Sequence, residues 1–326
     1  MSDPLVASNL VVAGTAPRAR VGLVLAGGGA KGAYQVGVLE YLAEAGVRLA
    51  AVAGASIGAL NASVVAAAPD LAAAAARLAA VWDETGRAAG AVSPGIGDLL
   101  TANPVTRPEF LERLLRRHVD LTELRAGLPL WVSVYPSPRP PAGLPDAGWF
   151  VDTVLVDASA RCQWLHVNSL PQEEMHEALC ASAALPLIMP PRTVGGVRYR
   201  DGGIADNTPI RALLAHAPCD LFIVVHLTRG ILWDARDYAP GQILEIRPEK
   251  SLSADGILGG VGAMLDFTSG RAAALRRQGY HDTGRVLETV REVIASASAL
   301  RHSQDIMLNS LRLLDEEATD VGPPPY

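Results

Sequence analysis

Residues 52–59 read VAGASIGA and place Ser56 at the centre of a Gly-x-Ser-x-Gly signature. Apolar, strand-like residues precede the signature, and an Ala-rich run that favours helix follows it. This setting is typical of a nucleophile elbow, a sharp strand-to-helix turn in which Gly54 and Gly58 leave room for the tight backbone. Such a turn exposes the Ser56 hydroxyl and points the N-terminus of the next helix at a developing oxyanion. The sequence therefore predicts a strand, a turn with a reactive serine, and a helix.

A second glycine-rich turn lies upstream, after the short apolar strand expected at Val21–Leu25. Residues 27–32 read GGGAKG, and the apolar residues that follow recur at helical spacing. Consecutive glycines can turn their amides toward one point, which suits a developing negative charge. Because adjacent parallel strands bring their following turns to one edge of a sheet, we expect this turn to face Ser56 as an oxyanion hole. The candidate amide groups belong to Gly27, Gly28, Gly29 and Ala30.

Two other interpretations of the same turn remain open. Gly27, Gly29 and Gly32 satisfy the G-x-G-x-x-G dinucleotide fingerprint, which follows a strand and opens a helix. That fingerprint also has an acidic residue at the end of the second strand. Here the strand expected near residues 50–53 runs directly into the serine turn without an acid. The other interpretation is a tight strand–helix connection that binds no ligand.

A third motif is the run DGGIADNTP at residues 201–209, which closes the strand expected at Gly196–Arg200 and leads into a helix. Asp201 followed by Gly202 and Gly203 indicates either a sharp turn or a base held in a tight loop. Asp-Gly pairs are common in ordinary turns, so this run alone does not choose between the two.

Together these motifs resemble the patatin-like phospholipase family. Four matching segments occur in the family's order: GGGAKGAYQVGVL, GASIGALNAS, ASAALP at residues 181–186, and DGGIADNTPI. The closing region around residues 265–267 and Gly279-Tyr280 also looks like bacterial members, so the resemblance covers roughly residues 20–285. Two positions depart from the usual pattern. Lys31 stands where many members carry Arg, and residues 187–189 read LIM where an aromatic residue often precedes the prolines.

The resemblance implies a role for each motif. Ser56 would be the nucleophile, Asp201 its base, and the amides of the Gly27–Ala30 turn the oxyanion hole. A histidine triad is the competing arrangement, because Ser56, Asp201 and His226 follow the chain order of α/β-hydrolase triads, and His281 is a second candidate. The resemblance favours a Ser–Asp dyad that works without histidine.

Strands and helices alternate along the chain, which predicts a largely parallel sheet covered by helices on both faces. With the resemblance, we expect an α/β fold, a patatin-like three-layer sandwich around a mostly parallel central sheet. The expected parts are a mobile leader at 1–18, an acyl hydrolase domain at 19–285, and a C-terminal helical extension at 286–326 packed on that domain.

Periodicity and turn residues place further elements. The proline-rich stretch 136–145 is expected to be an exposed loop between strands. The expected strands are Leu130–Tyr135, Trp149–Val156, Leu221–Leu227 and Gln242–Ile246. The expected helices are Leu71–Trp82, Pro108–His118, Gln172–Ser182, Val261–Gln278 and Thr283–Leu314.

Composition and charge restrict the kinds of partner that the protein can bind. The chain has 326 residues, of which 49% are hydrophobic, enough for one large core. A net charge of −6 argues against nucleic acid and against docking on anionic lipid through bulk charge. Contact with a membrane or micelle surface should therefore be transient, local and apolar. The uncharged stretch 49–69 is long enough to span a membrane, but its glycines and polar residues fit a core strand and a buried helix better.

The cysteines and histidines show no metal-ligand spacing, so we expect neither a metal nor another cofactor. The three cysteines, Cys162, Cys180 and Cys219, fit free thiols in a reducing compartment. The N-terminus has no cationic leader, and we expect a cytoplasmic protein.

The predicted function is that of a serine acyl hydrolase that cleaves carboxylic esters of lipids, of the phospholipase A or lysophospholipase type. It would act through Ser56, Asp201 and an acyl-enzyme intermediate on a lipid or phospholipid substrate. The alternatives are a catalytically weak lipid-binding or regulatory relative and a dinucleotide-binding enzyme.

Overall fold

A computed structural model describes residues 19–90, 105, 107–137, 162–186, 188–229, 234–238, 242–253 and 262–320. The chain divides into two compact units, Met1–Thr283 and Gly284–Tyr326. The predicted leader at 1–18, the strand at Trp149–Val156 and the proline-rich loop beyond Ser137 lie outside the described residues.

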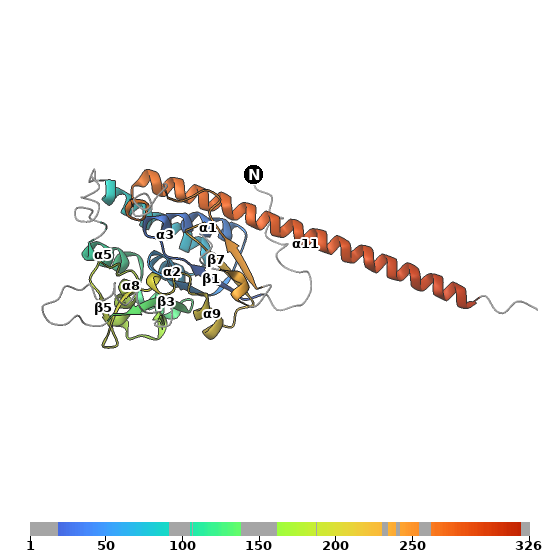
Figure 1. Cartoon of the computed structure of the whole chain (residues 1–326), viewed down its shortest axis with the longest axis horizontal. Helices are drawn as coiled ribbons and strands as arrows, with labels where there is room; N and C mark the ends of the chain where they lie inside the picture. The colour runs from blue at the N-terminus through green and yellow to red at the C-terminus, as the bar shows by residue number, and fades with distance from the viewer. Residues whose placement is uncertain are drawn as a thin grey trace, which may run out of the picture. The chain divides into compact units, whose positions relative to one another are not determined.

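An eight-stranded sheet forms the centre of the described part of the first unit (Figure 1). Seven strands follow the order β5-β6-β3-β2-β1-β7-β8, and β4 pairs with β3 beside this path. β3, β2, β1, β7 and β8 are parallel neighbours, whereas β4 and β6 run antiparallel to β3, and β5 antiparallel to β6. The strands are β1 Val21–Leu25, β2 Leu49–Gly54, β3 Leu130–Pro136, β4 Gln163–His166, β5 Arg192–Val194, β6 Val197–Asp201, β7 Leu221–Val225 and β8 Ile243–Ile246.

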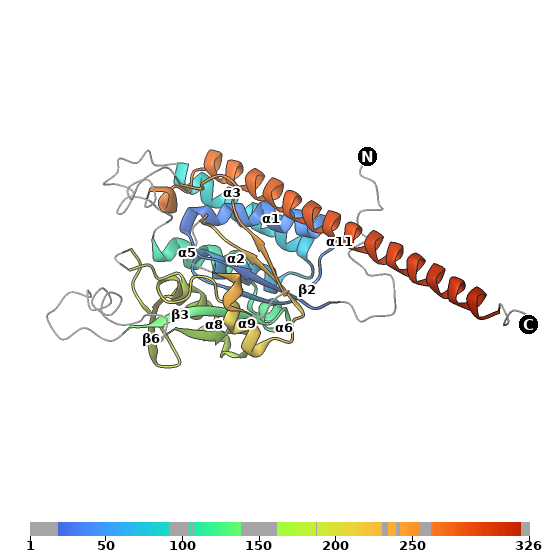
Figure 2. The same ribbon diagram turned by 45° about the vertical axis from the view of Figure 1, so that its right-hand side comes forward.

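Helices cover both faces of the sheet, with α1 and α3 on one side and α9 on the other (Figure 2). Side chains alternate between faces along each strand, so Val24, Ala53 and Val224 share one face and pack with Ile210 and Leu213 of α9. The three-layer α/β fold is therefore confirmed. The helices are α1 Ala33–Glu44, α2 Ile57–Ala67, α3 Leu71–Gly90, α5 Pro108–His118, α6 Leu121–Ala126, α8 Gln172–Ser182, α9 Ile210–His216 and α11 Ser269–Asp320.

The C-terminal helices differ from the prediction. In place of two helices at 261–278 and 283–314, a short helical turn at 262–265 is followed by one continuous helix, α11. Gly279 lies inside α11 and does not end it. A side chain at Gly279 would meet the Tyr34 carbonyl of α1, so this glycine serves a close approach between helices. Sequence periodicity also missed α6, β4 and β5, which have six, four and three residues.

The uncharged stretch that resembles a membrane span forms β2 and α2, as predicted. Among the described residues, no helix combines the length and the apolar character needed to cross a bilayer. All three cysteines are free, which confirms the prediction of free thiols.

Candidate active site

Ser56 stands between β2 and α2 in a strained conformation. Its backbone angles are φ 52° and ψ −126°, and no other described non-glycine residue has a positive φ. Such a conformation costs on the order of 1–3 kcal/mol and persists only where the surroundings enforce it. A side chain at Gly58 would collide with the Leu25 carbonyl of β1, and one at Gly54 with the Gly58 carbonyl. The two glycines thus allow the tight packing that holds the serine turn.

The glycine-rich turn lies directly beside Ser56. β1 and β2 are parallel neighbours, with Leu25 opposite Gly54, so the turns that follow them share one edge of the sheet. A Cβ atom on Gly27 would lie only 3.0 Å from the Ser56 Cβ atom. Gly29 has a φ of 59°, and a side chain there would also meet the Met264 carbonyl. The predicted proximity of the two turns is confirmed.

Not every amide of the turn is available to a ligand. The Gly27 N–H donates to the Asn207 carbonyl at 3.3 Å, while the Asn207 side-chain amide donates to the Gly27 carbonyl at 3.3 Å. In the described part of the chain, the N–H groups of Gly28, Gly29 and Ala30 have no hydrogen-bond acceptor. These three donors can therefore face a ligand without first breaking a bond.

A buried amide network fixes both ends of the glycine-rich turn. Gln35 Nε2 donates to the Ala26 carbonyl at 2.8 Å, and Asn61 Nδ2 donates to the Gly32 carbonyl at 3.1 Å. Asn61 also donates to Gln35 Oε1 at 2.8 Å and accepts from Trp82 Nε1 at 3.2 Å. Buried and satisfied networks of this kind rigidify the backbone that they hold. Sequence analysis missed these residues, since single polar positions in a helix carry no motif.

Asp201 ends β6 and is 1% exposed. Its Oδ1 atom accepts the Gly203 N–H at 2.7 Å, while Oδ2 has no hydrogen-bond partner among the described residues. Burial raises the pKa of Asp201 to about 7, an effect that the Ser56 hydroxyl and the Gly203 N–H oppose. The Ser56 side chain lies close enough to influence this pKa, yet the pair does not meet the geometry of an ordinary hydrogen bond. The carboxylate therefore retains an unused acceptor beside the serine.

The segment at residues 181–186 links the serine to the aspartate. The Ser182 hydroxyl accepts the Ser56 N–H at 3.1 Å, and the Ala184 carbonyl accepts the Asp201 N–H at 3.1 Å. Ser182 is fully buried. This segment contributed to the resemblance, but its contacts could not be derived from the sequence because they join residues far apart in the chain.

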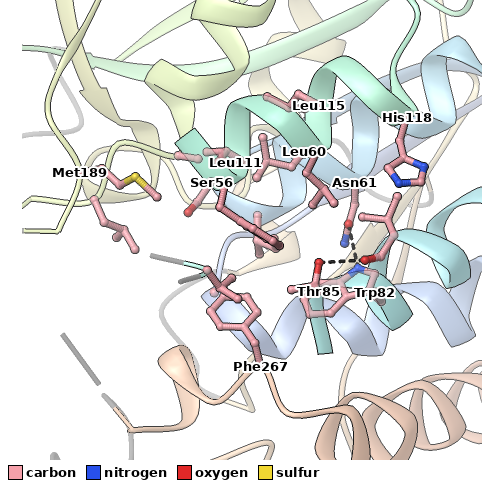
Figure 3. A pocket seen from close by; sticks show the side chains of 18 of the residues that line it. Ser56, Leu60, Asn61, Trp82, Thr85, Leu111, Leu115, His118, Met189 and Phe267 are labelled. Atoms are coloured by element: carbon pink, nitrogen blue, oxygen red, sulfur yellow. Dashed lines mark hydrogen bonds between the residues drawn. The ribbon is translucent and has the colours of Figure 1, made fainter. Parts of the chain in front are cut away.

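Ser56 borders an apolar cavity (Figure 3). Figure 3 shows Met189 and His118 toward opposite ends, with Ser56 and Leu60 between them. Most of the lining is apolar and comes from α2, α3 and α5, with further residues from the segments at 183–189 and 264–267. The helical lining residues are Ile57, Leu60, Asn61, Val64, Leu78, Val81, Trp82, Thr85, Phe110, Leu111, Leu114, Leu115 and His118.

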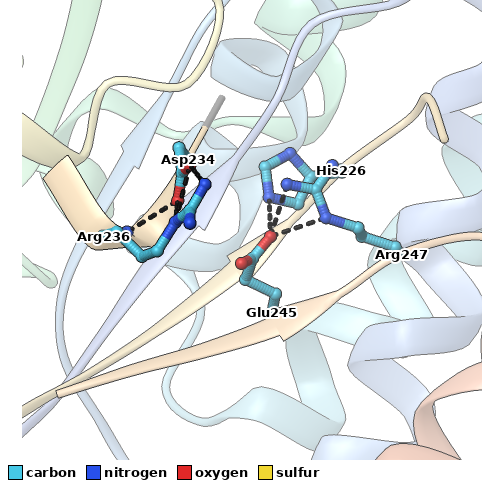
Figure 4. A network of polar contacts seen from close by, with 5 residues as sticks. All are labelled: His226, Asp234, Arg236, Glu245 and Arg247. Carbon is cyan, nitrogen blue, oxygen red and sulfur yellow. Dashed lines mark hydrogen bonds and ion pairs between the residues drawn. The ribbon is translucent and has the colours of Figure 1, made fainter. Parts of the chain in front are cut away.

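The two candidate histidines do not line this cavity. His226 follows β7, is 3% exposed, and has its Nε2 atom 3.1 Å from Glu245 Oε2 (Figure 4). Although Glu245 would favour a charged ring, burial and the nearby Arg247 dominate and lower the pKa of His226 to about 3. His281 borders a separate hollow with Arg276.

The two positions that depart from the usual family pattern lie near the site. Lys31 is 7% exposed, and burial together with Arg271 lowers its pKa. Ile188 and Met189 line the cavity, while Leu187 lies outside the described residues. Within the described ranges, no cluster of His, Cys, Asp and Glu side chains is suited to hold a metal ion.

Comparisons with known proteins show which family the chain belongs to. No curated protein matches the sequence significantly. The crystal structure of VipD from Legionella pneumophila shares 18% identity at a TM-score of 0.44, covering 84% of this chain and 67% of VipD. The type III effector protein ExoU shares 16% identity at a TM-score of 0.32, covering 95% of this chain and 67% of ExoU. Residues 23–214, more than half of the chain, match the patatin-like phospholipases, and the chain belongs to that family.

Proposed function

We propose that the protein is a serine acyl hydrolase that cleaves carboxylic esters of lipids, of the phospholipase A or lysophospholipase type. Membership of the patatin-like phospholipase family supports lipid hydrolysis in general terms. The observation that carries the specific proposal is the position of Ser56. It lies on the wall of an apolar cavity, beside a buried aspartate whose Oδ2 atom has no other partner among the described residues.

In the acylation step, Ser56 Oγ attacks the ester carbonyl carbon while its proton passes to Asp201 Oδ2. The carbonyl oxygen becomes an oxyanion, which the N–H groups of Gly28, Gly29 and Ala30 and the N-terminus of α2 stabilise. The intermediate then collapses, the alcohol portion of the lipid leaves with the proton from Asp201, and the acyl group stays on Ser56.

In the deacylation step, Asp201 removes a proton from water, which attacks the acyl-enzyme carbonyl. The second tetrahedral intermediate uses the same N–H donors and releases a free fatty acid. Ser56 recovers its proton, so the dyad returns to its starting state.

The environment of Asp201 suits a base. An aspartate with an ordinary pKa near 3.8 accepts a proton from a hydroxyl poorly, whereas burial raises the pKa of Asp201 to about 7. With this pKa, about half of the Asp201 carboxyl groups would be deprotonated at pH 7 and most of them above it, and each carboxylate would be a better proton acceptor than an exposed one. Donors aimed at an oxyanion are each worth about 3–4 kcal/mol of transition-state stabilisation.

The experiment that tests the proposal is labelling by a fluorophosphonate probe together with hydrolysis of short esters and phospholipids. Ser56→Ala should abolish both, because it removes the attacking oxygen. Ser63→Ala is the matched control, since Ser63 lies on the same helix, is fully buried, and donates to the Leu60 carbonyl at 2.7 Å away from the reaction. Hydrolysis retained by a folded Ser56→Ala protein would reject the proposal.

A further inference from the structure

The cavity beside Ser56 extends along one side of α2. The lining residues Ile57, Leu60 and Val64 recur every three or four positions, so they form a single apolar stripe on the helix. Eight residues separate Ser56 from Val64, and at 1.5 Å of rise per residue the stripe is about 12 Å long. Leu111 and Leu115 of α5 line the same cavity.

The end of the cavity furthest along α2 from Ser56 is buried. Val64 is 3% exposed, Leu78 of α3 is 0% exposed and Val119 after α5 is 1% exposed. Nearer to the serine, Leu60 and Met189 are half-buried. A chain that enters beside Ser56 therefore meets a wall at Val64.

A polar pair adds to this wall. His118 lines the cavity, and its Nε2 atom lies 2.9 Å from Glu84 Oε2, with both side chains half-buried. A hydrocarbon chain that continued past Val64 would have to displace a paired histidine and carboxylate. Hydrocarbon offers no hydrogen bond to replace this contact, so the polar pair disfavours extension of the cavity at this end.

We propose that this cavity is a closed acyl pocket that selects medium-length acyl chains, and that Val64 sets the limit of chain length. The inference rests on the proposed function, since it assumes that the acyl group is held with its carbonyl at Ser56. With tetrahedral carbon geometry, a span of about 12 Å accommodates on the order of ten chain carbons. Longer chains leave carbons outside the pocket.

The proposal predicts a break in the dependence on chain length. Each CH₂ group buried in the pocket strengthens binding by up to about fourfold, because it leaves water. This gain should stop at on the order of ten carbons. The probes are free saturated fatty acids of about four to about sixteen carbons, titrated calorimetrically into the full chain, and the matching p-nitrophenyl esters for hydrolysis.

Val64→Ala should move the break toward longer chains by about two carbons, because it removes the methyl groups at the closed end. Val65→Ala is the matched control, since Val65 is 2% exposed on the same helix and does not line the cavity. Val119→Ala enlarges the same end from another element and serves if Val64→Ala does not fold.

The outcomes separate this inference from the proposed function. A break in the fatty-acid series that moves in Val64→Ala and stays in Val65→Ala supports the acyl pocket, even if no ester is hydrolysed and the proposed function fails. An affinity that keeps rising to the longest chain, or identical profiles for both variants, overturns the pocket. In that case Ser56-dependent hydrolysis would leave the proposed function intact.

Discussion

Asp201 and His226 are both buried titratable residues at the ends of strands, yet their surroundings are opposite. Asp201 is 1% exposed, and its Oδ2 atom has no partner among the described residues. His226 is 3% exposed, and its ring lies against Glu245 on β8 (Figure 4). Burial alone therefore does not mark a reactive group. An unused hydrogen-bonding atom beside a nucleophile distinguishes Asp201.

The contrast also appears in their pKa values. Burial raises the pKa of Asp201 to about 7, which makes the carboxylate a stronger base near neutral pH. Burial and Arg247 lower the pKa of His226 to about 3, so the ring stays neutral over the same range. The structure of the His226 region fits a packed polar contact between strands, and the triad interpretation gains no geometric support.

The largest expected effect separates these two residues. Asp201→Asn should reduce kcat/KM by about a thousandfold or more, because an amide cannot accept the serine proton. His226→Ala should keep most of the activity, since Glu245 stays paired with Arg247. His281→Ala should likewise keep most of it. Steady-state kinetics on a soluble ester checks the three variants, with circular dichroism to verify folding. A folded His226→Ala protein with the larger loss would reverse the assignment.

A smaller effect is expected from pH. In the proposed mechanism the attack needs a deprotonated Asp201, so kcat/KM should fall by about tenfold per pH unit below the pKa of about 7 and level off above it. His226→Ala should leave the midpoint in place. A pH–rate profile on an ester without titratable groups measures this directly. A profile that stays flat down to pH 5 would show that the base has an ordinary carboxylate pKa.

A further effect concerns stability rather than rate. Because the folded pKa of Asp201 exceeds the unfolded value of 3.8, its contribution to stability is complete below that value and is lost as pH rises through about 7. Asp201→Asn should therefore increase the free energy of unfolding at pH 8, by up to about 4 kcal/mol for three pKa units, and change it little at pH 3.5. Urea denaturation at both pH values tests this, and an equal effect at both would contradict it.

His226 should give the opposite slope. Its folded pKa lies below the unfolded value of 6.5, so its contribution is complete above pH 6.5 and is lost as pH falls toward about 3. Substituting His226 should therefore make the fold less sensitive to acid, whereas substituting Asp201 makes it less sensitive to alkali. The same denaturation series with His226→Ala checks the sign.

The parts of the site that the sequence predicts are those built from local backbone geometry. Gly54 and Gly58 around Ser56 indicated a tight turn, and the tight turn is present. The glycine-rich turn after β1 was placed beside Ser56 because neighbouring parallel strands end at the same edge, and this neighbourhood is confirmed.

The parts that escaped prediction depend on contacts between distant segments. Ser182 supports the Ser56 backbone, and Asn207 holds Gly27 on both its N–H and its carbonyl. A serine or an asparagine inside a helix or loop gives no periodic signal that would reveal such a partner. The continuous helix α11 was predicted as two helices on either side of residues 279–282, whereas Gly279 lies inside α11 and serves a close approach to Tyr34.

The order of the strands has a consequence for the newly made chain. β1 lies between β2 and β7, yet β7 is synthesised long after β1 and β2 have left the ribosome. Ser56 and the glycine-rich turn emerge early, whereas Asp201 and Asn207 arrive only after most of the first unit has been translated. Since β1 cannot complete its pairing before Leu221–Val225 is available, the central sheet cannot close on a partial chain. The growing polypeptide thus carries the proposed nucleophile without the carboxylate beside it, and translation itself delays the assembly of the proposed site.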